Sequence, residues 1–227
     1  MTIGFRVLAR HRAVSAEWVE RYRSLPVANV SDSMHRMAAG GARLTMMHRE
    51  GVLAGPALTV RTRPGDNLML HKAIDMAGPG DVIVVDAGGE LTNSLMGELM
   101  LAHSVKRGVA GFVLNGAIRD AEAFLRVNLP VFAAGVTHRG PYKDGPGEIN
   151  VPVALGDMVV EPGDLMLGDR DGVLAVPFDA VEDVHARTAA KQDAEARQMA
   201  AIEAGTNDRT WVDAALHRLG CEMEAAG

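Results

Sequence analysis

Three short apolar segments separated by helical patterns constrain the fold of this chain more than any other feature. The first runs over residues 82–85, the second ends just before Arg119, and the third runs over residues 131–134. Strands that are apolar at every position are buried on both faces, which is typical of parallel sheets covered by helices. Residues 94–107 have the spacing of an amphipathic helix between the first two segments. The alternation predicts an α/β core in which helices connect parallel strands.

The segments that precede this core are predicted from capping and periodicity. Residues 56–63 have the composition of a strand, and residues 67–77 have the spacing of a helix capped by Asp66 or Asn67. A first helix is expected over residues 15–25, with Ser15 as its N-cap.

A second short helix is expected to follow Pro26. Ser31 or Asp32 is predicted to cap it, and it is predicted to end at Gly40–Gly41. Asp32 is alternatively a polar group at the edge of a site.

The chain changes character after residue 137, where Gly, Pro and Asp become frequent. We expect a β-rich half that packs onto the α/β half, because no long linker divides the two. The expected strands cover residues 151–154, 158–160, 165–168 and 173–176. The motif GPGE at residues 145–148 is predicted to be a loop, and GDRDG at residues 168–172 a turn.

The C-terminal part is predicted to be helical from about residue 178. A long helix ends at Gly205, and a final helix lies near residues 211–219. Because the apolar face of the long helix is narrow and rich in Ala, we expect this extension to pack on a neighbouring subunit. Residues 1–227 are predicted to form a single domain with this extension.

Composition excludes several classes of protein. A chain of 227 residues with 48% hydrophobic residues can bury a sizeable core. A formal net charge of −6 argues against nucleic acid as a partner, because phosphate recognition needs clustered Lys and Arg. No stretch approaches the ~18 consecutive apolar residues of a membrane span. The single Cys, Cys221, rules out an intramolecular disulfide and fits a cytoplasmic location.

Two pairs of residues are candidates for chemistry. Arg119 and Asp120 follow the second apolar segment, where Arg can bind a carboxylate with two hydrogen bonds and Asp can hold a divalent metal. Gly97 and Glu98 lie near the start of the helical pattern that precedes it. If that helix begins nearer Gly97 than Ser94, its first free amides, around Leu99 and Met100, can bind an anion.

Each of these residues also has a simpler structural interpretation. An Arg-Asp pair is often a surface ion pair, Gly97 can be a packing position, and Glu98 can be a solvated carboxylate favoured by the helix dipole. The functional interpretation gains weight because all of them fall on one edge of the predicted parallel sheet, where α/β proteins bind ligands.

Other polar residues carry weaker signals. The His residues show no metal-ligand spacing, and no GxGxxG or phosphate-binding loop is present. His71 and Lys72 could face the site, although a surface position is favoured for both.

Several motifs together resemble one known family. In order, they are PGDVIVVDAGG, GELM, GFVLNGAIRD, INVPVALGDMVVEPGD and GDRDGVLAVP. Over residues 25–205 the chain is similar to the RraA-like family. That family includes metal-dependent (class II) aldolases for 4-hydroxy-4-methyl-2-oxoglutarate and 4-carboxy-4-hydroxy-2-oxoadipate, which also decarboxylate oxaloacetate, and a regulator of ribonuclease activity without aldolase function. The resemblance implies a layered β/β/α sandwich of the swivelling phosphohistidine-domain type and a homotrimer or homohexamer.

The resemblance also implies roles for individual residues. Arg119 corresponds to the arginine that binds the pyruvyl group, and Asp120 to the aspartate that holds Mg²⁺ or Mn²⁺. The amides around Leu99 and Met100 would hold the pyruvate carboxylate. Glu98 takes the place of an acidic residue, often Asp, that orients a water. The glutamate borrowed from the C-terminal helix of a neighbouring subunit corresponds to Glu195, or else to Glu203.

The function implied is a lyase that cleaves a 4-hydroxy-2-oxo diacid to pyruvate and a second oxo-acid. The metal and Arg119 would stabilise the enolate, and Glu98 would act through water on the 4-hydroxyl proton. Two alternatives stay open: a regulator that binds ribonuclease E and does no chemistry, and a related lyase that acts on another 2-oxo-acid.

Overall fold

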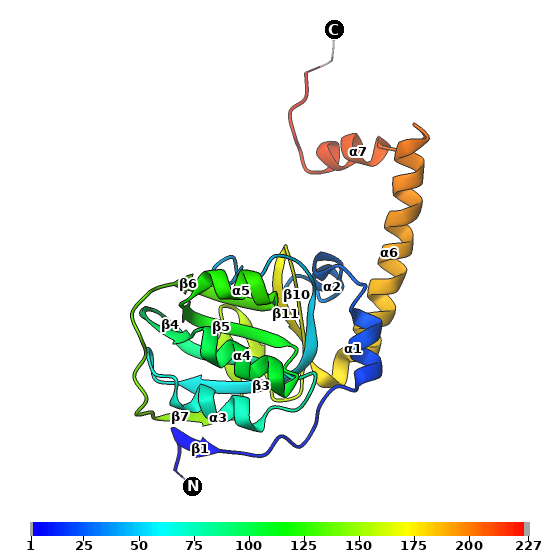
Figure 1. Cartoon of the computed structure of the whole chain (residues 1–227). Coiled ribbons are helices and arrows are strands. Elements are labelled where there is room, and N and C mark those ends of the chain that lie inside the picture. The colour runs from blue at the N-terminus through cyan, green and yellow to red at the C-terminus, as the bar shows by residue number, and fades with distance from the viewer. Residues whose placement is uncertain (1, 225–227) are drawn as a thin grey trace. The chain divides into compact units, whose positions relative to one another are not determined.

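The computed structural model of the chain describes residues 2–224 and contains one long sheet (Figure 1). Its four central strands run parallel and are β3 (Leu53–Thr62), β4 (Val82–Met96), β5 (Gly111–Ile118) and β6 (Val131–Val136). The order along the sheet is β1-β7-β3-β4-β5-β6-β2. The strands outside this centre are β1 (Phe5–Val7) and β7 (Gly147–Ile149) beyond β3, and β2 (Thr45–Met46) beyond β6. The predicted α/β core with parallel strands is confirmed.

Both faces of the central strands are covered. Ile83 and Val85 belong to a cluster with the helices α3 (Leu68–Met76), α4 (Glu98–Arg107) and α5 (Ala121–Val127), which lie together on one face (Figure 1). Val82 and Val84 belong to a second cluster on the opposite face. That face is covered by α1 (Ala16–Tyr22), α2 (Val27–Ser33), β8 (Val153–Leu155), β9 (Met158–Val160), β10 (Leu165–Asp169) and β11 (Gly172–Val176). The apolar run of β4 is thus buried on both sides, and the layers follow the predicted β/β/α order.

Strand β4 is longer, and helix α4 shorter, than the sequence pattern predicts. The helix was expected from about Ser94, but β4 continues through Met96 and α4 begins at Glu98. Ser94 pairs with Ala117 of β5 in a part of β4 where the register between the two strands shifts. The N–H of Ser94 donates to the carbonyl of Arg139 at 2.8 Å. These partners come from distant parts of the chain, and they hold in a strand a segment whose local spacing is helical.

Of the caps predicted for the first two helices, the first is confirmed and the second is wrong. Ser15 caps α1 as predicted, accepting a hydrogen bond from the N–H of Trp18. The prediction for α2 is wrong, because this helix begins directly after Pro26 and ends at Ser33. Asp32 lies inside it and pairs with Arg36 at 2.7 Å. Pro26 is the N-cap with an extended ψ of 135°, and the N–H of Val27 donates to Asp169 Oδ2 at 3.0 Å, a contact from a distant strand that holds the start of this helix.

The motif predicted to be a loop at residues 145–148 contributes instead to strand β7. This strand pairs with β3 on one side and with β1 on the other. It carries Glu148, whose side chain is 1% exposed and accepts a hydrogen bond from Arg6 Nε at 2.7 Å and another from Arg61. Burial by itself raises the pKa of Glu148, but the N–H of Gly4 and the two guanidinium groups outweigh it and lower the pKa below its ordinary value.

Replacing Glu148 with glutamine should therefore destabilise the fold in a pH-dependent way. At neutral pH we expect a loss of about 1–3 kcal/mol in the free energy of unfolding, because Arg6 and Arg61 lose their charged partner. Since the folded-state pKa is lowered, the carboxylate stabilises the fold above its unfolded-state pKa and ceases to do so as the pH falls through the folded value. Urea unfolding of both proteins between neutral pH and about pH 3 should show the difference shrink on the acid side. A constant difference, or an equal effect of Glu50→Gln at an exposed position, would contradict this assignment.

The chain divides into two compact units, Met1–Thr188 and Ala189–Gly227, and the division falls within α6 (Val181–Glu203). In the first unit the hydroxyl of Tyr22 donates to the carbonyl of Val181 at 2.7 Å and holds the start of α6. The second unit contains the rest of α6 and α7 (Thr210–Arg218), and it exposes Trp211. No helix in the described part of the chain has the length and apolar character of a membrane span. Packing of this unit on a neighbouring subunit stays a prediction.

Candidate functional site

The candidate residues meet where β4 and β5 end and α4 and α5 begin. Gly97 is the N-cap of α4, and Asp120 is the N-cap of α5. The N–H of Arg119 donates to the carbonyl of Met96 at 2.9 Å, which joins the two strand ends. Asp120 has φ of 58°, a left-handed conformation that Asp adopts more readily than most residues. Two loops distant in sequence are thus brought together at one sheet edge.

Asp120 connects the two pairs of residues. Its Oδ2 accepts a hydrogen bond from the N–H of Glu98 at 3.0 Å and lies 3.8 Å from Arg119 Nε. The side chains of Arg119 and Asp120 are 44% and 45% exposed. Asp120 is therefore anchored by a hydrogen bond, Arg119 is paired with it, and both side chains are accessible to a ligand.

Gly97 provides the room for this arrangement. Its φ of −142° is ordinary extended backbone, so the conformation does not require glycine. A Cβ atom at this position would lie 2.5 Å from Asp120 Oδ2 and 3.0 Å from Arg119 Nε. Any side chain at this position would displace Arg119 and Asp120. Gly97 is therefore required by the site itself, and not only by close packing as the structural interpretation of the sequence suggested.

The start of α4 leaves two amides available to an anion. The N–H of Leu101 donates to the carbonyl of Gly97, and the N–H of Glu98 is taken by Asp120. The amides between them, those of Leu99 and Met100, come before Leu101, which is the first residue whose N–H has an acceptor within the helix. Because the positive end of the helix dipole adds to these donors, the position favours a carboxylate.

These groups line a pocket of about 170 Å³. This volume is smaller than the roughly 300–1,000 Å³ of pockets for drug-sized ligands, so the site suits a small molecule. Gly97, Leu99, Met100, Arg119 and Asp120 all contribute to its lining. The structure thus brings together five of the residues singled out in the sequence.

The other acidic candidates are placed differently. The carboxylate of Glu98 pairs with Arg126 of α5 and does not line the pocket. Glu195 lies in α6 within the second unit and pairs with Lys191 at 2.9 Å, and Glu203 is the last residue of α6. The described residues contain no group of three or more potential metal ligands of the His, Cys, Asp or Glu type. Asp120 is the carboxylate that the first unit offers at the pocket.

Three residues that line the pocket were either not predicted as site residues from the sequence or were favoured at the surface. Asn67 and His71 come from the start of α3, and Lys143 from the loop after β6. His71 is exposed, as favoured from the sequence, and it also lines the pocket, whereas Lys72 is exposed outside it. The spacing of four between Asn67 and His71, which places both on one helix face, was a usable signal. Nothing local to Lys143 indicated its position.

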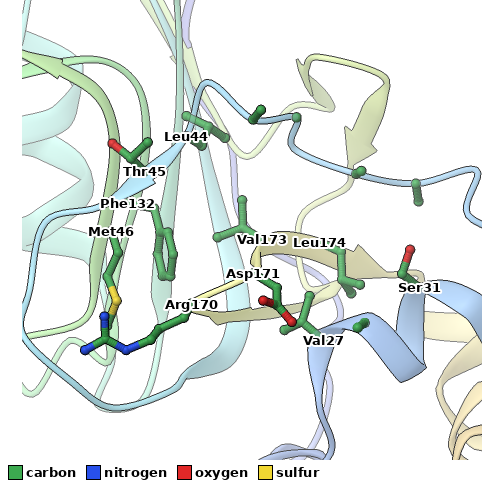
Figure 2. Close-up of a pocket in the computed structure, with 16 residues that line it drawn as sticks. Val27, Ser31, Leu44, Thr45, Met46, Phe132, Arg170, Asp171, Val173 and Leu174 are labelled. Atoms are coloured by element: carbon green, nitrogen blue, oxygen red, sulfur yellow. The ribbon is translucent and has the colours of Figure 1, made fainter.

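A larger pocket of about 590 Å³ lies between α2, residues 38–46 and the β10–β11 hairpin (Figure 2). Its lining is mostly aliphatic, and of the described residues that line it only Arg170 and Asp171 are charged. The Arg170 side chain extends toward Met46 (Figure 2), and its guanidinium donates to the carbonyl of Arg49 at 2.8 Å. The two charged residues of this pocket are neighbours in one hairpin turn, and the guanidinium of Arg170 already has a protein acceptor. The smaller pocket is therefore the candidate site.

Fold and site define a class: a layered α/β protein that presents an arginine, a carboxylate and a helix N-terminus at the edge of its parallel sheet. The family model RraA-like (Aldolase/RraA) matches residues 27–175. A protein from Halalkalibacterium halodurans, provisionally named a 4-hydroxy-4-methyl-2-oxoglutarate aldolase, is 36% identical over 88% of this chain and 96% of its own length. The chain belongs to the RraA-like family.

Two further relatives show the range of names within this family. A 4-hydroxy-4-methyl-2-oxoglutarate aldolase from Thermus thermophilus is 36% identical over 55% of this chain and 75% of its own length. The crystal structure of RraAS2 from Streptomyces coelicolor, described as an unusual member of the RNase ES inhibitor RraA protein family, matches with a TM-score of 0.74 and 26% identity. This match covers 81% of the present chain and 96% of the other. Relatives of this chain are thus named both as enzymes and as inhibitors.

Proposed function

We propose that this protein is a metal-dependent aldolase, a carbon–carbon lyase. Its proposed substrates are 4-hydroxy-4-methyl-2-oxoglutarate and 4-carboxy-4-hydroxy-2-oxoadipate, each cleaved to pyruvate and a second oxo-acid, with oxaloacetate decarboxylation as a side activity. The observation that carries the proposal is the convergence of Arg119, Asp120 and the free amides of α4 on one small pocket. The aldolase names of the two relatives support it.

Asp120 is the residue that would hold a divalent cation. Its contacts to Glu98 and Arg119 both use Oδ2, and the side chain is half-exposed beside the pocket. Mg²⁺ is commonly held by about one or two carboxylates, with water and substrate oxygens completing its coordination. A single carboxylate at a small-acid pocket therefore fits Mg²⁺ or Mn²⁺ better than zinc, which needs more protein ligands. When bound, the cation would supply Lewis-acid polarisation of the 2-oxo group.

A second carboxylate is proposed to come from another copy of the chain. In a homotrimer or homohexamer, Glu195 of α6 would reach the pocket of a neighbouring subunit, and Glu203 is the alternative. The exposed Trp211 and Met199 of the second unit fit a surface that is covered on assembly.

The residues of this chain would bind the 2-oxo acid end of the substrate. The amides of Leu99 and Met100 would take its carboxylate, with the helix dipole adding to their attraction. The Arg119 guanidinium would bind the pyruvyl group and stabilise the negative charge that develops on its 2-oxo oxygen. Asp120 would keep both groups in position through its contacts to Glu98 N–H and Arg119.

The proposed reaction breaks the bond between C3 and C4 of the substrate. The 4-hydroxyl loses its proton and C4 becomes a carbonyl, while the bonding electrons pass to the pyruvate half as an enolate. A proton added to C3 then completes the methyl group of pyruvate. Because Arg126 holds the carboxylate of Glu98 beside the pocket, we propose that Glu98 acts on these protons only through water.

A pyruvate assay tests the proposal directly. Purified protein should release pyruvate from these 4-hydroxy-2-oxo acids and from oxaloacetate when Mg²⁺ or Mn²⁺ is supplied. Removal of the metal with EDTA should reduce the rate to background, and added Mg²⁺ should restore it, because the polarisation of the 2-oxo group is lost and regained. Full activity in EDTA would overturn metal dependence, and the absence of pyruvate from the whole panel would overturn the aldolase proposal.

A second candidate is a regulator that binds a ribonuclease, which the description of the Streptomyces relative favours. A pull-down with purified ribonuclease E, run beside the pyruvate assay, separates the two. Ribonuclease capture without pyruvate release would favour the regulator. Pyruvate release from another 2-oxo-acid alone would favour a related lyase.

A further inference from the structure

The larger pocket, between α2, residues 38–46 and the β10–β11 hairpin, is separate from the candidate site. Its lining residues Phe132 and Val173 belong to the hydrophobic cluster on the face that α1, α2 and β8–β11 cover. Leu95 and Met96, which line the smaller pocket, belong to the cluster beneath α3, α4 and α5. The two pockets therefore lie over opposite faces of the sheet, and the larger one has no role in the proposed reaction.

Small side chains create the volume of about 590 Å³ in this pocket. Six of the residues that line it are alanine or glycine: Ala28, Ala38, Ala39, Gly41, Ala42 and Gly172. Larger side chains at these positions would occupy the space between the strap of residues 38–46 and the hairpin. The volume falls within the roughly 300–1,000 Å³ of pockets that bind small molecules, and the mostly apolar lining favours a ligand with an apolar body.

Arg170 supplies the positive charge of this lining. One N–H of its guanidinium donates to the carbonyl of Arg49 at 2.8 Å, which is a neutral acceptor. Within the part of the chain that the structure describes, Arg170 forms no ion pair with a carboxylate. Because a guanidinium has five N–H donors, further donors remain for an anion, and two parallel N–H groups match the two oxygens of a carboxylate.

Asp171 limits the charge that a ligand can carry. The Arg170 side chain extends toward Met46, whereas the Asp171 carboxylate lies beside Val27 (Figure 2). The two charges of the hairpin turn thus point in different directions. A second anionic group placed near Val27 would be repelled by Asp171, so the pocket matches one carboxylate and not two.

We propose that this pocket binds an aliphatic monocarboxylic acid of medium chain length, and that Arg170 binds its carboxylate. The apolar lining would cover the chain, and the charge of Arg170 would determine which end of the ligand lies beside Met46. This binding site goes beyond the proposed aldolase function and does not depend on it. A second copy of the chain that covers the same apolar surface is the competing occupant.

The test is calorimetric titration of the full-length protein with three eight-carbon compounds: octanoate, octan-1-ol and octanedioate. Octanoate should bind at least about 10-fold more tightly than octan-1-ol, as expected for a hydrogen bond to a charged group. Octanedioate should bind more weakly than octanoate, because its second carboxylate meets Asp171. Equal affinity for octanoate and octan-1-ol would remove Arg170 from the site, and tighter binding of octanedioate would contradict the preference for one carboxylate.

Substitutions locate the ligand. Arg170→Gln should raise Kd for octanoate by about 10- to 100-fold and leave Kd for octan-1-ol within about twofold. Arg139→Gln is the matched control, because this exposed arginine lines neither pocket. Ala28→Phe should weaken the binding of both compounds, since Ala28 lies in α2 with its side chain at the pocket and a helix accepts phenylalanine there. Circular dichroism of each variant establishes that it is folded.

Arg119→Lys distinguishes the two pockets without any catalytic measurement. It should leave the affinity for octanoate unchanged, because Arg119 lines the smaller pocket. Loss of octanoate binding in this variant, or unchanged binding in Arg170→Gln, would overturn the assignment to the larger pocket. If the unaltered protein binds neither octanoate nor octan-1-ol, the proposal is wrong, and sedimentation of the unaltered protein and Ala28→Phe then shows whether a second copy covers this surface.

Discussion

Replacing Asp120 with asparagine should reduce metal-dependent pyruvate release by about 10³-fold or more, because a neutral amide holds a hard cation poorly and several kcal/mol of Lewis-acid stabilisation are lost. The fold should persist. Asparagine retains an oxygen that can accept the N–H of Glu98, and it tolerates the left-handed conformation with φ of 58°. Asp120→Ala removes that acceptor as well, so it should lose the same activity and about 1 kcal/mol of stability.

Glu122→Gln is the matched control, because this exposed carboxylate lies in the first turn of the same helix and outside the pocket. Rates with and without Mg²⁺ should be measured together with melting temperature. A folded Asp120→Asn protein that keeps the Mg²⁺-dependent rate of the unaltered chain would remove Asp120 from the metal site. Equal loss in Glu122→Gln would point to a general effect of charge on α5.

Replacing Arg119 with lysine should lower kcat/KM by about 10²- to 10³-fold although the charge is kept, because lysine cannot bind a planar oxo-acid through two parallel N–H groups. The loss should appear in kcat as well as in KM if Arg119 stabilises charge that develops during cleavage. Arg119→Ala should lose more, and added guanidinium should restore part of the rate to that variant alone. The measurement is steady-state pyruvate release over a range of substrate concentrations.

Arg139→Lys provides the control for Arg119, since its side chain is exposed and does not line the pocket. The contact that Arg139 makes to Ser94 uses its backbone carbonyl, which the substitution leaves in place. A rise in KM without any change in kcat for Arg119→Lys would restrict Arg119 to substrate binding. Unchanged kinetics in Arg119→Lys would contradict a bidentate role.

Some features of the candidate site were predictable because their causes are local. Arg119 and Asp120 follow directly on an apolar strand, so their place at a sheet edge depends on neighbouring residues alone. Other features had no local cause. Glu148 lies in a motif typical of turns, yet it is buried because Arg6 and Arg61 reach it from other strands.

Glu98 likewise has one feature with a local cause and others that depend on distant residues. That Glu98 belongs to a helix could be predicted from the helical pattern, but its place in the first turn of α4 and the direction of its side chain could not. Arg126, on the following helix, determines that direction by pairing with it. Sequence similarity assigned a role to the position, whereas the structure placed its carboxylate outside the pocket lining.

The sequence by itself determined the layered α/β architecture and one half of the pocket. Apolar runs such as residues 82–85 are stable only when they are buried on both faces, and such a run can be recognised from consecutive residues in the sequence. The tertiary structure alone decided where α4 begins and brought Lys143 to the pocket mouth. Those outcomes depend on Ser94 bonding to Arg139 and on Asp66 holding the backbone beside Lys143, and hydrogen bonds between distant residues leave no periodic signal in the chain.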